Sequence, residues 1–136
     1  IILWDGYCYV HNKISRDIVL KAKEMHPDAV IVSHPECSPE IIDISDEVAS
    51  TSQMIKIARK RMSQEFVIVT ECGMAEKLKI EVPEKKFFSI GTTCVQMKKN
   101  NLQKVYECLL HEKNEISVDS DVSKKAKKAL DRMLEA

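Results

Sequence analysis

The sequence has no excess of charge of either sign, because 21 Lys and Arg residues balance 21 Asp and Glu residues. It therefore gives no electrostatic reason to expect nucleic acid or a membrane surface as a partner. No apolar run approaches the roughly 20 residues that a membrane-spanning helix needs. No linker, low-complexity segment or repeat interrupts the chain. A hydrophobic content of 44% and a charged content of 31% are usual for a globular domain of 136 residues.

Closely paired cysteines are also missing. An odd, widely spaced set without a Cys-x-x-Cys pair argues against a disulfide framework and against a zinc finger. The five are Cys8, Cys37, Cys72, Cys94 and Cys108. This cysteine pattern leads us to expect a protein of the reducing cytoplasm. The first residues also lack the basic segment and the small-residue cleavage site of a secretory signal. Because the sequence starts with Ile1 rather than Met, we expect a piece of a longer protein.

One stretch combines a strand, a polar turn and a helix start. Val30–Val32 is a short β-branched run typical of a strand that is covered on both faces. Pro35 cannot continue a central strand, because proline has no N–H to donate. Ser38–Glu40 combines an N-cap serine, a first-turn proline and a first-turn acid, which predicts a helix. His34 and Glu36 therefore lie between a strand and a helix, where open α/β sheets bind ligands.

Short apolar runs alternate with amphipathic stretches along the chain. This order predicts an α/β fold, a three-layer α-β-α arrangement around a mainly parallel sheet. We expect an α/β domain over 1–95, and closing helices with a short strand over 96–136. Strands are expected at 1–4 (a strand end), 29–33, 66–70, 86–90 and 116–118, a loop at 5–12, and helices at 15–25, after 38, from 50, at 74–80, 102–110 and 121–134.

Several chemically active side chains follow predicted strand ends. The carboxyl ends of parallel strands lie at one edge of a sheet, so these side chains should share one rim. This placement is the strongest functional signal in the residues themselves. The set is Cys8, His11, His34, Glu36, Glu71 and Cys94.

The thiols at this rim allow two interpretations. Cys8 and His11, spaced Cys-x-x-His, are either metal ligands or a packed thiol beside a capping histidine. Cys94 is either a ligand or a buried cysteine. Two loop cysteines can each give a thiolate to a soft metal or an iron–sulfur cluster. They are too few for a four-cysteine cluster, so other ligands would have to come from elsewhere.

The polar residues also have alternatives. His34 and Glu36 are either a general acid/base pair or residues that cap helix ends. Ser50 and Thr51 offer hydroxyls and backbone N–H groups at a helix start, which suits a carboxylate or phosphate. Ser50 with Gln53 three residues later also fits a plain capping box, which is the more common meaning of this pattern. Glu71 is a rim acid or, more commonly for such a residue, a solvated one.

The sequence resembles the C-terminal part of quinolinate synthase over essentially its whole length. Each motif alone is weak, and their order along the chain makes the resemblance specific. Position 49 is Ala where many family members have Gly. The matching motifs are Trp4-x-Gly6-x-Cys8-x-Val10-His11, His34-Pro35-Glu36-Cys37, Ala49-Ser50-Thr51-Ser52, Cys94-x-x-Met97-Lys98 and Ala129-Leu130-x-Arg132-Met133-Leu134.

The resemblance implies an enzyme of NAD biosynthesis that condenses iminoaspartate (iminosuccinate) with dihydroxyacetone phosphate to quinolinate, phosphate and water. It implies three similar α/β domains around a pseudo-threefold axis, each giving one cysteine to a central [4Fe–4S] cluster with one open iron. Cys8 and Cys94 match two of these ligands. The third would lie in a preceding domain outside this chain, so this chain alone should be inactive.

The resemblance also implies roles for the polar residues. His34 and Glu36 match a substrate-contacting His-Pro-Glu motif that includes Pro35, with Glu36 as the proton-transfer carboxylate and His34 as its catalytic partner. His11 matches a histidine near the substrate. Ser50 and Thr51 match the position that holds a substrate carboxylate or phosphate. Cys37 and Cys72 match no ligand position.

Two other functions compete with this one. The first is a non-catalytic α/β module that binds an anion at Ser50 and Thr51 and carries ordinary buried cysteines. The second is a structural zinc site built from Cys8, His11 and Cys94. Brown colour and visible absorbance of an anaerobic preparation would separate the enzyme from the first, and metal analysis would separate it from the second.

Overall fold

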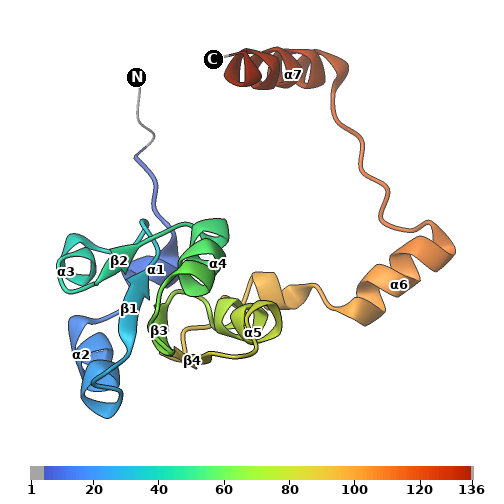
Figure 1. Cartoon of the computed structure of the whole chain (residues 1–136). Coiled ribbons are helices and arrows are strands. Elements are labelled where there is room, and N and C mark those ends of the chain that lie inside the picture. The colour runs from blue at the N-terminus through green and yellow to red at the C-terminus, as the bar shows by residue number, and fades with distance from the viewer. Residues whose placement is uncertain (1–4, 136) are drawn as a thin grey trace. The chain divides into compact units, whose positions relative to one another are not determined.

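The computed structural model describes residues 5–135, and the chain divides between Val95 and Gln96 into two compact units (Figure 1). The strand end expected at residues 1–4 lies outside the described residues. The first unit contains a sheet and the helices that cover it. The second contains only helices and their connections.

In the part of the first unit that the structure describes, from residue 5 on, the strands form a four-stranded parallel sheet with the order β2-β1-β3-β4. The strands are β1 (Val30–Ser33), β2 (Glu47–Val48), β3 (Glu65–Val69) and β4 (Lys86–Ser89). Every pairing is parallel, with Val32 opposite Ile68 and Phe66 opposite Phe87. The predicted parallel sheet is therefore confirmed, and all four carboxyl ends lie at one edge.

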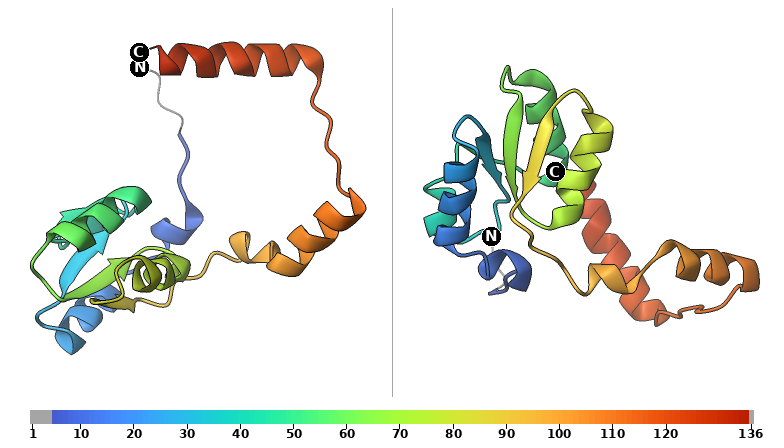
Figure 2. Two further views of the ribbon diagram at one scale, coloured as in Figure 1. Left: turned by 45° about the vertical axis from the view of Figure 1, so that its right-hand side comes forward. Right: turned by 90° about the horizontal axis from the view of Figure 1, so that it is seen from below.

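Helices cover both faces of this sheet, which confirms the three-layer α-β-α arrangement (Figure 2). On one face, Phe66 packs with Met54 of α4 (Thr51–Lys60) and Leu78 of α5 (Cys72–Glu81). On the other face, Val67 packs with Val19 of α2 (Arg16–Met25) and Ile41 of α3 (Pro39–Ile42). The β-branched runs of β1 and β3 are buried on both sides, as their sequences predict.

Three local predictions were wrong. Residues 9–12 form one helical turn, α1 (Tyr9–Asn12), inside the expected loop, closed by the N–H of Asn12 donating to Cys8 O at 3.0 Å. Strand β2 was missed, because two residues are too few to show an alternating pattern. The strand expected at 116–118 does not form: this stretch has no strand pairing among the described residues, and Ile116 is 85% exposed.

The second unit holds a 3₁₀ turn, η1 (Met97–Lys99), and two helices, α6 (Leu102–His111) and α7 (Ser120–Leu134). Side chains cap both helices: Asn101 Oδ1 accepts the N–H of Lys104, and Asp119 Oδ1 accepts two N–H groups of α7. Both helices leave an apolar side uncovered among the described residues, including Leu109 and Met133. Within residues 5–135, no helix has the length and apolar character to cross a membrane.

Helix α5 supplies a sharp test of the core. Leu78 is fully buried against the sheet, whereas Ile80, two residues later in the same helix, is 81% exposed. Leu78→Ala should lower the free energy of unfolding by about 2–5 kcal/mol, because it removes buried methyl groups and leaves a cavity. Ile80→Ala should change it by less than about 0.5 kcal/mol. Urea unfolding of both variants measures these changes. Equal losses of unfolding free energy in the two variants would contradict this packing.

Candidate active site

The candidate site lies at the carboxyl edge of the sheet, between β1 and β3. From β1 the chain moves to one side to form β2, and then crosses to the other side to form β3. Open α/β sheets bind ligands at such a reversal, and we call the place between the chain segments that follow β1 and β3 the crevice. The N–H of His34, directly after β1, donates to Val69 O at 3.2 Å, which joins the start of the loop after β1 to the end of β3.

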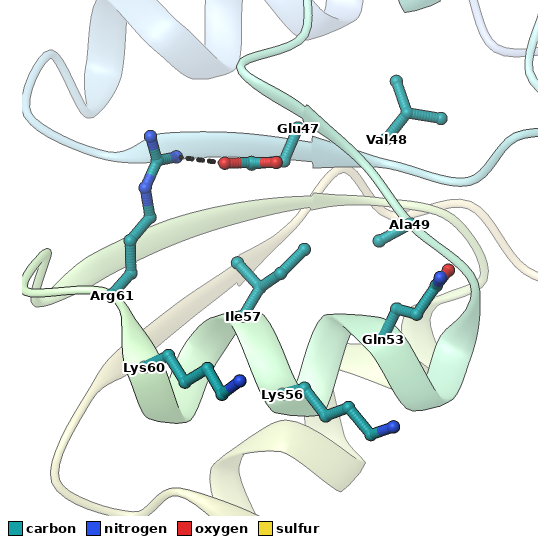
Figure 3. A pocket seen from close by; sticks show the side chains of 8 residues that line it. All are labelled: Glu47, Val48, Ala49, Gln53, Lys56, Ile57, Lys60 and Arg61. Atoms are coloured by element: carbon teal, nitrogen blue, oxygen red, sulfur yellow. Dashed lines mark ion pairs between the residues drawn. The ribbon is translucent and has the colours of Figure 1, made fainter.

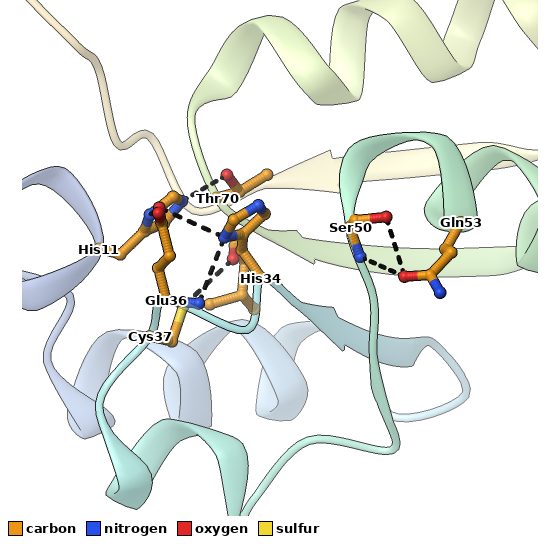
Figure 4. Close-up of polar contacts among 8 residues, drawn as sticks. His11, His34, Glu36, Cys37, Ser50, Gln53 and Thr70 are labelled. Carbon is orange, nitrogen blue, oxygen red and sulfur yellow. Dashed lines mark hydrogen bonds and ion pairs between the residues drawn. The ribbon is translucent and has the colours of Figure 1, made fainter. Parts of the chain in front are cut away.

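His11 connects residues from three parts of the chain (Figure 4). Its Nδ1 lies 2.9 Å from Glu36 Oε2, and its Nε2 lies 2.7 Å from the hydroxyl of Thr70. His11 and Thr70 are buried, whereas the side chain of Glu36 is 54% exposed. A carboxylate that is anchored at one oxygen and still reaches solvent can exchange a proton with a bound ligand.

His34 stacks on His11, with ring centroids 4.4 Å apart and an interplanar angle of 5°. Its Nδ1 accepts the N–H of Glu36 at 3.3 Å and lies 3.6 Å from Glu36 Oε2. The pKa of His34 is lowered, chiefly by burial and next by the electrostatic effect of the neighbouring His11 ring, while the Glu36 carboxylate opposes the shift. Neutral His34 therefore carries its proton on Nε2, which has no hydrogen-bond partner among residues 5–135 and can donate to a ligand.

The lowered pKa of His34 makes stability depend on pH. Below the ordinary histidine pKa of 6.5, the unfolded chain binds this proton more readily than the folded chain does. The stability contributed by neutral His34 is complete above that pH and is lost as pH falls through the folded pKa. His34→Gln should therefore reduce the acid-side loss of stability, measured by urea unfolding at pH 7 and pH 5. The control is His111→Gln, at an exposed site, which should lose as much stability between pH 7 and pH 5 as wild type does. An equally large loss in His34→Gln would contradict this prediction.

The two predicted ligand cysteines lie on adjoining loops. Cys8 precedes α1 and is half-buried, and Cys94 is buried. The hydroxyl of Tyr9, the residue after Cys8, lies 3.4 Å from Cys94 Sγ. The ligand atoms of Cys8, His11 and Glu36 all lie within 4.8 Å of one another. The zinc alternative assumed a site of Cys8, His11 and Cys94. The structure instead groups Glu36 with Cys8 and His11, so these three residues are the ones that could hold a small divalent ion.

The remaining cysteines differ in environment. Cys37 is buried, with its Sγ 3.6 Å from Val69 O, and burial raises the pKa of its thiol to about 11. Cys37 therefore stays a neutral thiol at physiological pH, which makes it a poor nucleophile and a poor ligand. Cys72 begins α5, where its Sγ lies 3.3 Å from a Glu71 carboxylate oxygen.

The Ser50 and Thr51 pair is adjacent to the crevice. The N–H of Ala49 donates to Ser33 O at 2.9 Å, so α4 begins beside the end of β1. Both the N–H and the hydroxyl of Ser50 donate to Gln53 Oε1, at 2.9 and 2.8 Å (Figure 4). Thr51 is exposed at the first position of the helix. An anion at this helix start would replace Gln53 as the partner of Ser50. Pro35 lies exposed in the turn between His34 and Glu36.

Two residues after β3 have roles that the sequence did not reveal. Thr70 contacts His11, and an isolated threonine after a strand gives no signal of this. Glu71 is buried rather than solvated, and its Oε2 accepts the N–H of Gly73 at 2.7 Å. The interpretation of Glu71 as a solvated acid was therefore wrong, because the carboxylate serves as the N-cap of α5.

A groove of about 410 Å³ lies elsewhere, between β2 and α4 (Figure 3). Ile57 lies inside it, and an ion pair between Arg61 and Glu47, with an N–O distance of 3.1 Å, closes one end. None of the residues at the crevice except the capping Gln53 and Ala49 lines it. The groove is thus distinct from the cluster of titratable residues.

Comparison with known proteins identifies the family of this chain. A family model described as quinolinate synthetase A protein matches residues 1–135. A quinolinate synthase of Caldicellulosiruptor saccharolyticus is 46% identical over 137 residues, and one of Clostridium novyi is 41% identical over 134. One of Methanosarcina barkeri is 43% identical over 136 residues.

These alignments cover 98–99% of this chain but only 45% of each relative. The chain thus spans a little under half the length of the curated relatives that it matches. The family model, in contrast, covers all but the last residue of the chain. On this evidence, the chain belongs to the quinolinate synthetase A family.

Proposed function

We propose that the protein carrying this chain condenses iminoaspartate with dihydroxyacetone phosphate to give quinolinate, phosphate and water, as a step of NAD biosynthesis. The observation that supports this most is the joining of His11, His34 and Glu36 in the β1/β3 crevice, beside Cys8. Membership of the family supplies the reaction, and the crevice supplies groups able to carry out its proton transfers.

Glu36 is the proposed proton-transfer group. The condensation requires removal of protons from carbon and loss of hydroxyl groups as water, so one carboxylate can serve as base and then as acid. Hydrogen bonding to His11 fixes one oxygen of Glu36, while more than half of its side chain remains accessible. His34 acts as its partner, because its Nε2–H is available to a substrate oxygen.

Ser50 and Thr51 are proposed to hold a substrate carboxylate or phosphate. The first N–H groups of a helix are unpaired within the helix and carry partial positive charge, which favours an anion. Helix α4 has ten residues and starts beside the end of β1. The Ser50 hydroxyl, now bonded to Gln53, can turn to an anion at little cost. His11 and Pro35 complete the proposed contacts to substrate.

Cys8 and Cys94 are proposed to be two ligands of a [4Fe–4S] cluster. They fit this group in that both are cysteines of low exposure, on loops that meet through Tyr9. The third thiolate would come from a part of the protein outside this chain. When bound, a cluster with three protein ligands supplies an open iron that acts as a Lewis acid. The chain's own residues bind and orient the substrates and move protons at Glu36.

The rest of the protein is the proposed partner of this chain. The family resemblance implies three α/β domains around a pseudo-threefold axis, of which residues 1–95 would be one. The uncovered apolar sides of α6 and α7 suit packing of 96–136 against a neighbouring domain. This chain alone would then be inactive, and the protein would act in the cytoplasm without nucleic acid or membrane.

The direct test is anaerobic purification of the full protein with iron and sulfide. We expect about four irons and four sulfides per chain, brown colour, and quinolinate formation from the two substrates. A colourless protein that binds neither would favour a non-catalytic anion-binding module. One zinc per chain without sulfide would favour a site at Cys8, His11 and Glu36, which the 4.8 Å grouping of their ligand atoms allows.

A further inference from the structure

Thr70 is a buried residue at the crevice to which the proposed reaction gives no part. It directly follows β3, is 4% exposed, and its hydroxyl lies 2.7 Å from His11 Nε2. That contact joins residues 59 positions apart. A hydroxyl buried at this depth needs a partner, and it has taken one nitrogen of a histidine in the site.

The two nitrogens of His11 face groups with different hydrogen-bonding abilities. Nδ1 faces the Glu36 carboxylate at 2.9 Å, and an ionised carboxylate can only accept. Nδ1 must therefore carry the proton. Neutral His11 then has a bare Nε2, which needs a donor, and the Thr70 hydroxyl is a donor placed at that atom. The opposite tautomer would set the lone pair of Nδ1 against the lone pairs of Glu36.

The geometry points to Thr70 as a positioning residue: its hydroxyl donates to Nε2 of His11, fixes the ring proton on Nδ1, and so holds the Glu36 carboxylate in place. The inference rests on the proposed role of Glu36 in quinolinate formation. Thr70 touches no reacting atom itself. It acts on Glu36 through His11, whose ring also carries the stacked ring of His34 at 4.4 Å.

A purely structural role for Thr70 would give different results. If the hydroxyl only satisfied a buried polar group, its loss would lower stability and leave the His11 tautomer and the turnover of the folded enzyme unchanged. If it positions His11, its loss frees the imidazole to rotate or change tautomer. If the Glu36 carboxylate moves by a fraction of an ångström as a result, turnover should fall more than substrate binding weakens.

The first measurement needs no variant. ¹⁵N chemical shifts of histidine side chains in the full protein, before iron is added, report which nitrogen of His11 carries the proton. We expect a protonated Nδ1 and a bare Nε2, assigned by comparison with His11→Gln. A protonated Nε2 in the neutral ring would overturn the inference whether or not the protein makes quinolinate.

The second measurement uses Thr70→Val, which keeps the shape and removes the hydroxyl, and Thr70→Ser, which keeps the hydroxyl. We expect Thr70→Val to lower kcat by about 10- to 100-fold with a much smaller change in KM, and to mix the His11 tautomers. Thr70→Ser should recover most of the wild-type kcat and most of the wild-type His11 tautomer. If Thr70→Val does not fold, Thr70→Ala takes its place.

The control is Ser45→Ala, which removes a hydroxyl that donates to Ile41 O at 2.6 Å outside the crevice. It should leave kcat and the tautomer unchanged. Wild-type kcat in folded Thr70→Val, or an unaltered tautomer, would overturn the positioning role. If no protein of the set forms quinolinate, the proposed function fails while the ¹⁵N shifts still decide the role of Thr70.

Discussion

Replacing Cys8 or Cys94 by alanine should remove most of the iron and sulfide from the anaerobically reconstituted protein and reduce quinolinate formation below detection. Each change takes away one thiolate from a proposed set of three, and a cluster held by two protein thiolates is expected to be lost. The two residues stand on loops that meet where Tyr9 touches Cys94. Iron and sulfide analysis, visible absorbance and a quinolinate assay measure the result.

The matched control for the cysteine variants is Cys37→Ala. Cys37 lies in the same His-Pro-Glu-Cys motif as the proposed catalytic pair, but burial keeps its thiol protonated. Its replacement should keep iron, sulfide and turnover, with some loss of stability from the vacated volume. Full iron and sulfide in Cys8→Ala or Cys94→Ala, together with normal turnover, would remove both residues from the ligand set.

Glu36→Gln should keep the cluster and lose turnover by about 10²- to 10⁴-fold, the usual contribution of a general acid/base. The amide has nearly the same shape and can still accept from His11 Nδ1 through its oxygen, but it cannot take up a proton. Iron content and circular dichroism should therefore match wild type. The measurement is kcat under anaerobic conditions.

Glu40→Gln is the control for Glu36→Gln. Glu40 is an exposed carboxylate four residues later, in the first turn of α3, and has no hydrogen bond to the crevice residues. It should retain wild-type turnover. Equal kcat for Glu36→Gln and Glu40→Gln would exclude Glu36 from the chemistry, and equal loss in both would point to a general electrostatic effect.

The sequence predicts the fold well where local chemistry and burial agree. Val30–Val32 and Phe66–Val69 are β-branched or aromatic runs, and both are buried strands. Ser50 starts α4 as its spacing to Gln53 predicts. Strand β2 was not predicted, because its two residues are a strand only by virtue of their pairing with β1, which lies earlier in the sequence. The sequence around Ile116 resembles that of a strand, but among the described residues it pairs with no other strand.

The candidate site was predicted as a set of residues after strand ends, and less well as a set of contacts. The parallel rule placed His11, His34 and Glu36 together, because carboxyl ends share an edge. It did not reveal that His11 would be the central residue, bonded on both nitrogens, since side-chain pairing depends on rotamers and burial. Glu71 was misread for the same reason: a charged residue after a strand is usually solvated, and here it caps α5.

A crystal structure of the anaerobically loaded protein is the most direct test of the central claim. We predict the sulfurs of Cys8 and Cys94 bound to one iron–sulfur centre, with Glu36 and the Nε2 of His34 facing the same cavity. Sulfurs directed into separate parts of the protein, with no shared cavity and no metal between them, would contradict it.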